Sequence, residues 1–353
     1  MNKLGRIAAI ASIYIGTIIG AGFASGQEIW FFFSRYGTEG RWGLLVSTIV
    51  FGFLGAKAIE WGRRIGSCSY QDFLINLTGK YFGYFSDLMM TTFIFLLTGV
   101  MLAGSGAVAA ETGLGREMVC WITVCLTVLI LSQHLEGIKG VNLFVVPLLF
   151  IMGIIINFSE EKVILSVWEQ TTSSGSWLLA SLQYSAYNLV MALPVLVTLY
   201  RLEPDPMILK WGGLIGGLSL GILALLFYRV LVKYDFSTID LPLAFITQHW
   251  KKGWRYLYLV ALWGELFTTL IAHAYALASR FNLPKNRWYL GKLFLILSMA
   301  VLISRLGFAR LIKRLYPLFG FFSFTILLPL WFKPLPALED GQEIYRKSSF
   351  FDL

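Results

Sequence analysis

The chain has 353 residues, of which 57% are hydrophobic and 14% are charged, and its formal net charge is +9. The apolar residues form long blocks separated by short polar gaps, a pattern that indicates an integral membrane protein and leaves no room for a soluble catalytic domain. The basic residues are scattered over many short segments, which favours contact with lipid headgroups over binding to nucleic acid.

Apolar blocks bounded by charged residues, proline or glycine predict ten membrane-spanning helices, which together make one transmembrane domain over residues 1–353. The polar segment 65–80 is too short to cross the bilayer and predicts an interfacial helix, and the stretch 241–250 predicts another. The predicted spans are 6–34, 42–62, 81–110, 117–133, 138–158, 177–200, 208–232, 255–279, 289–304 and 309–332.

Two of these spans carry polar residues where a lipid-embedded helix should be apolar. Residues 16–28 of the first read Gly-Thr-Ile-Ile-Gly-Ala-Gly-Phe-Ala-Ser-Gly-Gln-Glu, and residues 183–188 of the sixth read Gln-Tyr-Ser-Ala-Tyr-Asn, with Pro194 beyond them. Backbone leaves helical geometry at membrane depth only where protein buries it or where it lines a wet cavity. We therefore predict that helices 1 and 6 are discontinuous and meet at a binding site.

Two halves of five spans, 6–158 and 177–332, would enter the membrane from opposite sides, so the spacing predicts an inverted repeat. Lys and Arg set the orientation: with the N-terminus inside, nine of them through Lys210 lie on cytoplasmic segments and four lie outside. This bias predicts that both termini are cytoplasmic, while the rest of the chain is uninformative.

The string Gly-Thr-Ile-Ile-Gly-Ala-Gly-Phe resembles the first-helix signature of the amino acid, polyamine and organocation transporter superfamily, whose members have the LeuT-type five-plus-five inverted-repeat fold. The longer string Tyr-Ile-Gly-Thr-Ile-Ile-Gly-Ala-Gly-Phe-Ala-Ser-Gly-Gln-Glu-Ile, together with residues 184–188, is similar to bacterial YkvI-type membrane proteins. The resemblance implies an all-α, LeuT-like carrier in the bacterial cell membrane, and it brings no substrate with it.

An interrupted helix leaves unpaired N–H groups at the start of its second half, and these favour an anion. As the superfamily resemblance implies, this part of span one is expected to bind an amino acid carboxylate, and carbonyls freed in span six are expected to hold its ammonium under the tyrosine rings. The alternative is that the glycines serve helix packing and the tyrosines fill the core. The candidate substrate-binding residues are Gly20, Ala21, Gly22, Phe23, Ser25, Tyr184, Ser185, Tyr187 and Asn188.

Span eight carries a polar stripe of Glu265, Thr268, Thr269 and His273. In LeuT-like carriers a sodium ion is bound between two hydroxyl groups of span eight and two backbone carbonyls just before the break in span one. The resemblance implies that the matching ligands in this chain are the hydroxyls of Thr268 and Thr269 and the carbonyls of Gly16 and Ile19. Some superfamily members place a lysine in span five for proton coupling, and residues 144–155 here hold no basic residue, which favours Na⁺ over H⁺.

Ionisable groups inside a membrane are costly, so Glu28 and Glu265 need a reason to exist. Either carboxyl group can carry a coupling proton, and either can instead serve a structural role. No cofactor is expected beyond the coupling ion.

The sequence thus predicts a secondary active transporter of a small solute, an amino acid or a related amine, that works by alternating access in the lipid bilayer. The alternative is a nutrient sensor of the same fold that binds without translocation, akin to spore-germinant receptor subunits. We do not expect an enzyme, because the three histidines are dispersed and neither a His-Glu-x-x-His pair nor a Gly-x-Ser-x-Gly elbow is present. Substrate identity and oligomeric state stay open.

Overall fold

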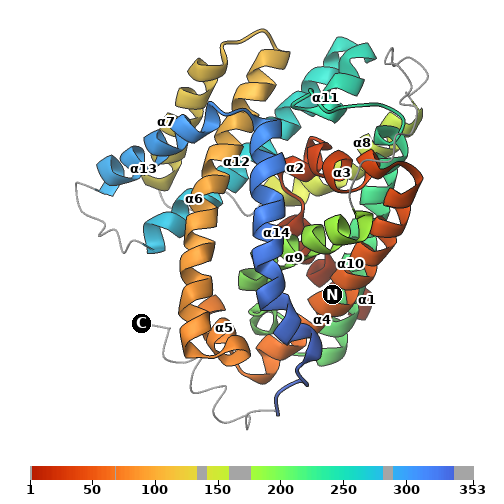
Figure 1. The fold of residues 1–353 in the computed structure, drawn as a ribbon, viewed down its shortest axis with the longest axis vertical. Coiled ribbons are helices and arrows are strands. Elements are labelled where there is room, and N and C mark those ends of the chain that lie inside the picture. Colours follow the sequence, from red (N-terminus) through yellow and green to blue (C-terminus); the bar gives the residue numbers. More distant parts are fainter. Residues whose placement is uncertain (1, 68, 133–140, 159–175, 281–288, 338–353) are drawn as a thin grey trace.

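The regular elements in the described part of the protein are all helices (Figure 1). The computed structural model describes residues 2–67, 69–132, 141–158, 176–280 and 289–337. The first half contains α1 (Lys3–Ile18), α2 (Ala21–Ala24), α3 (Gln27–Phe32), the 3-10 helix η1 (Ser34–Glu39), α4 (Gly40–Arg64), α5 (Tyr70–Thr78), α6 (Lys80–Glu111), α7 (Arg116–Ser132) and α8 (Val141–Phe158).

The second half repeats the alternation of long apolar helices and short connecting helices. It contains α9 (Trp177–Leu196), η4 (Leu199–Arg201), α10 (Pro206–Leu231), α11 (Pro242–Ile246), η5 (Thr247–His249), α12 (Lys252–Arg280), α13 (Tyr289–Ser304) and α14 (Phe308–Phe332). The segments predicted to be interfacial do hold the short helices α5, α11 and η5.

Each predicted span contains a helix, although residues 133 and 138–140 of the predicted fourth and fifth spans lie outside the described part of the chain. By length and apolar character, six helical segments in the described part are able to cross a membrane, which makes this a multi-pass membrane protein. These are Ser34–Arg64, Lys80–Glu111, Trp177–Arg201, Pro206–Leu231, Lys252–Ala278 and Phe308–Phe332. The count of ten spans and the inverted repeat stay predictions.

The long helices form two groups. Helices α1, α4, α9 and α10 pack against one another, and so do α6, α7, α12 and α13. Helix α14 contacts both groups, and Figure 1 shows it lengthwise beside α6. The short segments α2 and α3 touch both groups as well, since α2 packs on α12 while α3 packs on α9, α10 and α14.

Glycines bring the backbones of α4 and α10 into direct contact. A Cβ added at Gly217 would lie 2.3 Å from the backbone nitrogen of Gly52, and one at Gly213 would lie 2.8 Å from the Cα of Ala56. Only a residue without a side chain permits such an approach, which is why small residues at four-residue spacing are typical of tightly packed membrane helices.

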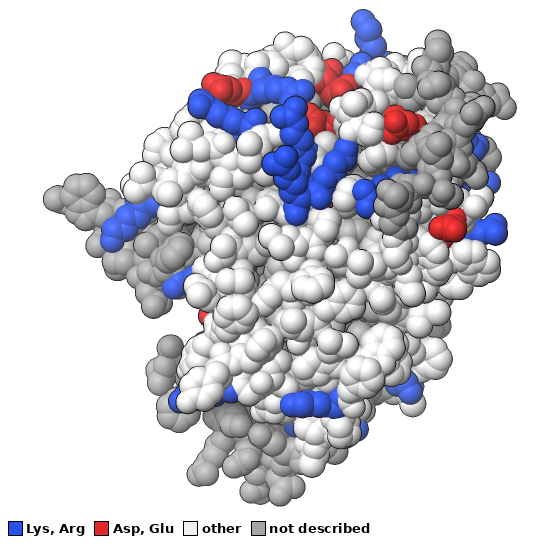
Figure 2. Space-filling model, viewed as in Figure 1, with Lys and Arg blue, Asp and Glu red and all other residues white. Residues whose placement is uncertain are grey.

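Charged side chains gather toward the two ends of the molecule. On the face drawn in Figure 2, Lys and Arg lie above and below a broad band in which uncharged residues dominate, and most of the Asp and Glu residues lie above it. This distribution fits a protein whose middle is surrounded by lipid and whose ends meet headgroups and water.

Candidate functional site

The first span is interrupted where the glycine-rich string predicts. Helix α1 ends at Ile18, and Ile19 (ψ 113°) and Gly20 (φ −126°, ψ −176°) adopt extended conformations before α2 begins. A second interruption follows at Gly26, whose φ of 79° lies in the left-handed region that glycine accepts without strain, and α3 begins after it. The segment is therefore two short helices joined by turns.

Short helices leave backbone groups without helical partners. The amide of Ala24 donates to Gly20 and that of Ser25 donates to Ala21, while the Ser25 hydroxyl donates to the Gly22 carbonyl. Among the described residues, no backbone amide donates to the carbonyls of Gly16 or Ile19. These two carbonyl oxygens therefore accept no backbone hydrogen bond from the described residues, as the predicted cation site requires of its ligands.

The Glu28 carboxylate lies directly beside this segment. Glu28 is in the first turn of α3 with 4% of its surface exposed, and a Cβ added at Gly22 would lie 1.9 Å from its Oε1. Its Oε2 accepts a hydrogen bond of 2.5 Å from the Tyr187 hydroxyl. Gly22 is therefore needed for the space that the carboxylate fills, and Glu28 joins the interrupted helix to α9.

Aromatic rings surround the Glu28–Tyr187 contact. The Tyr187 ring centroid lies 5.6 Å from that of Tyr184, 5.0 Å from that of Tyr316 in α14 and 5.7 Å from that of Phe32 in α3. The buried Tyr184 hydroxyl has no hydrogen-bond partner in the described part of the protein, and neither does either polar atom of the Gln27 amide. Buried polar groups that lack partners inside the protein are candidates for contact with a ligand or water.

Helix α9 corrects one prediction. It runs without interruption from Trp177 to Leu196, so helix 6 is continuous through residues 183–188, and its carbonyls there are not freed for an ammonium. The Ser185 hydroxyl donates to the carbonyl of Ser181, and the Asn188 amide donates to that of Tyr184. Because these polar side chains bond to their own helix, they need no break to be satisfied.

Helix α12 meets the interrupted segment from the other helix group. The Tyr258 hydroxyl donates to the Ala24 carbonyl of α2 at 2.8 Å. Residues seven apart lie on the same face of a helix, so Glu265 shares the face of α12 from which Tyr258 reaches α2. Thr269, four residues after Glu265, lies on that face as well. Glu265 is 2% exposed, and its Oε2 has no hydrogen-bond partner among the described residues.

The predicted sodium ligands are only partly arranged as expected. Thr268 is buried, but its hydroxyl donates to the Glu265 carbonyl of its own helix at 3.2 Å. Thr269 is half-buried, as is Gly16, whereas Ile19 is buried. No hydrogen bond in the described part of the chain joins α12 to Gly16 or Ile19, so the sodium site stays a prediction.

The structure brings some of the predicted site residues together and keeps others apart. The structure brings Gly22, Glu28 and Tyr187 together, with Tyr184 beside them, and it turns Ser185 and Asn188 toward α9 itself. Sequence reasoning missed Tyr316 and Tyr258, which arrive from distant spans with no local motif. Gln27 could have been identified from the sequence, because an amide side chain inside the first apolar block requires a polar partner.

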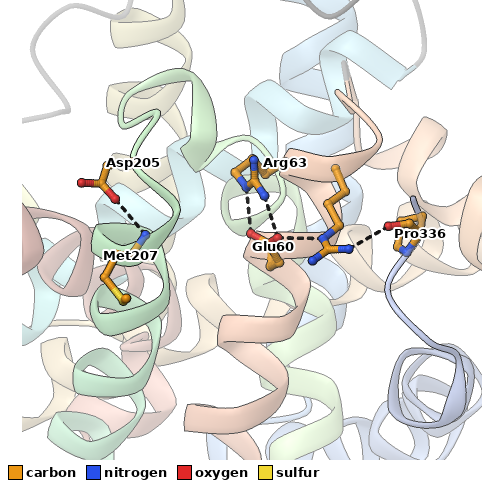
Figure 3. Close-up of polar contacts among 6 residues, drawn as sticks. Glu60, Arg63, Asp205, Met207 and Pro336 are labelled. Atoms are coloured by element: carbon orange, nitrogen blue, oxygen red, sulfur yellow. Dashed lines mark hydrogen bonds and ion pairs between the residues drawn. The ribbon is translucent and has the colours of Figure 1, made fainter. Parts of the chain in front are cut away.

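Polar contacts hold the ends of the helices at the side of the molecule where α5 lies. Figure 3 shows that Glu60 accepts hydrogen bonds from Arg63 in the same helix. Arg64 also donates to Glu60, and it donates to the Pro336 carbonyl beyond α14. Figure 3 also shows Asp205 accepting from the Met207 amide, which caps the start of α10.

A further ion pair joins the start of α1 to the connection before α10. The Arg6 guanidinium donates to both carboxylate oxygens of Glu203, at 2.7 and 2.5 Å. This bidentate hydrogen bonding holds the pKa of the Glu203 carboxyl below its ordinary value. The contact ties the N-terminal end of the interrupted helix to its own helix group.

Comparison with known proteins agrees with this architecture. The chain is 35% identical to the "Uncharacterized membrane protein YkvI" of Bacillus subtilis (strain 168) over 342 residues, which cover 94% of this chain and 97% of that relative. It is 26% identical to the "Uncharacterized protein YyaD" of the same organism, over 92% of this chain and 95% of that relative. No family model matches the chain.

Solved transporter structures share the fold. The nucleobase-cation-symport-1 family transporter Mhp1, in a closed conformation with bromovinylhydantoin bound, matches with a TM-score of 0.52 at 14% identity and covers 92% of this chain and 75% of its own. The manganese transporter of Eremococcus coleocola, in complex with an aromatic bis-isothiourea substituted compound, matches with a TM-score of 0.51 at 12% identity, over 99% of this chain and 91% of its own. At these identities the likeness concerns the fold.

Proposed function

The chain belongs to the family of the membrane protein YkvI, and from this premise we propose that it is a secondary active transporter of a small solute, an amino acid or a related amine, that works by alternating access. The observation that carries the proposal is the junction of Gly22, Glu28 and Tyr187, a buried polar site at an interrupted helix. Interrupted helices at membrane depth are typical of carrier binding sites.

The position of this junction supports alternating access. The short helices α2 and α3 contact α12 on one side and α9 and α10 on the other, so a ligand held there is touched by both helix groups. Rocking of one group against the other would open the site to each side of the membrane in turn. The solved neighbours named above are both transporters, which supports the same class of function.

For the driving ion we propose Na⁺, held by the carbonyls of Gly16 and Ile19 with the hydroxyls of Thr268 and Thr269. Support comes from the two carbonyls, which accept no backbone hydrogen bond among the described residues, and from the packing of α12 on α2. Oxygen ligands suit a hard cation that is bound weakly enough to leave. Proton coupling through Glu28 or Glu265 is the alternative.

The direct test is transport by the purified protein in proteoliposomes. We expect currents or radiolabel uptake when an amino acid and amine mixture is added together with an inward sodium gradient. Gly22→Leu should abolish them without lowering the amount of protein inserted, and Glu117→Gln, a change at an exposed carboxylate, should not. Uptake that ignores sodium and follows an imposed proton gradient would replace Na⁺ by H⁺, and ligand binding without any flux would support the sensor.

A further inference from the structure

Glu28 is a buried acid for which the described part of the protein provides no counter-charge. No ion pair among the described residues includes it, and its one hydrogen bond comes from the neutral Tyr187 hydroxyl. An ionised carboxylate without a partner is strongly destabilising at such a depth. Glu28 must therefore be neutralised, either by a proton or by a positively charged ligand.

The charged and titratable groups on the long helices packed against α3 are consistent with this. Helices α9 and α14 contribute Tyr184, Tyr187 and Tyr316 to the cluster around Glu28, and a tyrosine hydroxyl is ordinarily neutral at physiological pH. From α10, Tyr228 donates to the Gly37 carbonyl instead, and α11 carries no charged residue.

Two cations lie nearby but are engaged elsewhere. Arg35 stacks over the Phe31 ring at 3.9 Å and donates to the Tyr36 hydroxyl. Lys313 lies over the Trp30 ring at 5.2 Å and donates to the Ser237 carbonyl. Neither forms an ion pair with Glu28 in the described part of the chain.

The geometry also decides between the two ends of an amino acid. A ligand carboxylate at Gly22 would bring no charge that can neutralise Glu28, and beside the ionised form of Glu28 it would be repelled strongly. A ligand ammonium cannot use α9 carbonyls, because that helix is continuous through residues 183–188. The Glu28 carboxylate is the one group of this junction with the charge to hold an ammonium.

The rings around Glu28 favour the same ligand. Tyr184, Tyr187, Tyr316 and Phe32 have centroids within 5.0 to 5.7 Å of a neighbouring ring in the cluster. Aromatic faces attract cations, with most effect where water is excluded. A carboxylate within an aromatic cluster is the chemistry that recognises an organic ammonium ion.

We propose that the transported solute is an organic amine whose ammonium group replaces a proton on Glu28, so that each amine bound displaces one proton. In the empty carrier the proton sits on the Glu28 carboxyl. When R–NH₃⁺ binds, the O–H bond of the carboxyl breaks, the proton leaves to solvent, and the ammonium pairs with the carboxylate that remains. Charge in the site is the same before and after. This inference rests on the proposed carrier function, names its ligand, and places the proton alternative at Glu28, apart from the proposed Na⁺ ligands.

The experiment is calorimetric titration of the full-length protein in detergent with methylamine, butylamine and phenethylamine, repeated in buffers of different ionisation enthalpy. We expect release of about one proton per amine and an affinity that rises about tenfold per pH unit while Glu28 is protonated in the empty protein. Glu28→Gln keeps the side-chain shape and an acceptor for Tyr187, and it should remove the proton release and weaken binding at least about tenfold. Glu117→Gln, at an exposed carboxylate, is the matched control.

The outcomes separate this inference from the carrier function. Amine binding without proton release, or equal binding by Glu28→Gln and wild type, overturns the inference. Sodium-driven currents with zwitterionic amino acids, in the absence of binding by any of the three amines, overturn it while the carrier function stands. Absence of flux for every amine and amino acid tested rejects the carrier function itself.

Discussion

Gly22→Ala tests whether the interrupted helix exists to make room for Glu28. The added Cβ would lie 1.9 Å from Oε1 and 2.6 Å from Cδ of Glu28, so the carboxyl must move. Its movement separates it from Tyr187, and leaving both groups buried without each other costs about 1–3 kcal/mol. The Glu28 side chain is flexible, so we expect a folded protein that has lost its transport site.

The measurements are the free energy of unfolding in a mixed-detergent titration and substrate-driven current in proteoliposomes. Gly253→Ala is the matched control, because that glycine, in the first turn of α12, has open space at its Cβ position and its replacement should change stability little. Gly22→Ala should fall about 1–3 kcal/mol below this control. If the two variants match in both stability and current, the argument from Gly22 to Glu28 is wrong.

Three further changes probe the fold. Arg6 lowers the pKa of Glu203, so their ion pair stabilises the fold at pH values above 4.5, the ordinary pKa of this carboxyl, and this stabilisation is lost as the pH falls below 4.5. Thermal unfolding of Glu203→Gln should therefore show a smaller loss of stability between about pH 7 and pH 3 than that of the wild type. Gly217→Ala should unfold or express poorly, because its Cβ meets the backbone of α4, whereas Gly291→Ala, at an open position, should be well tolerated. Tyr258→Phe should lower the free energy of unfolding by about 1 kcal/mol, since it removes one hydrogen bond to α2, and an unchanged value would show that this bond does not hold α12 to the interrupted segment.

Features that depend on the local chain were predictable from the sequence. Helices lie in the predicted spans because long apolar blocks have few other structures available in a membrane. The break at Ile19 and Gly20 follows from the glycine content of the first span, as predicted. The family resemblance drawn from the first-span string is confirmed by the 35% identity to YkvI.

The sixth span shows where such reasoning fails. Polar residues at 183–188 suggested unwinding, yet Ser185 and Asn188 satisfy their side chains by bonding to carbonyls one turn earlier. A sequence does not say whether a small polar side chain will break a helix or bond back to it, because both options satisfy the same group. Only the packing around α9 decides, and this packing includes Tyr316 from a helix more than a hundred residues away.

The role of Glu28 depends on the same long-range information. In the sequence, Glu28 is one of two intramembrane acids, and either of them can serve a structural role or carry a coupling proton. The contact with Gly22 comes from its own span, whereas the Tyr187 hydroxyl and the Tyr316 ring come from two others. Because that assembly provides hydrogen bonding and aromatic faces but no positive charge, an ionised Glu28 would need a cation or a proton, and this need is the basis of the proposed exchange of an amine for a proton.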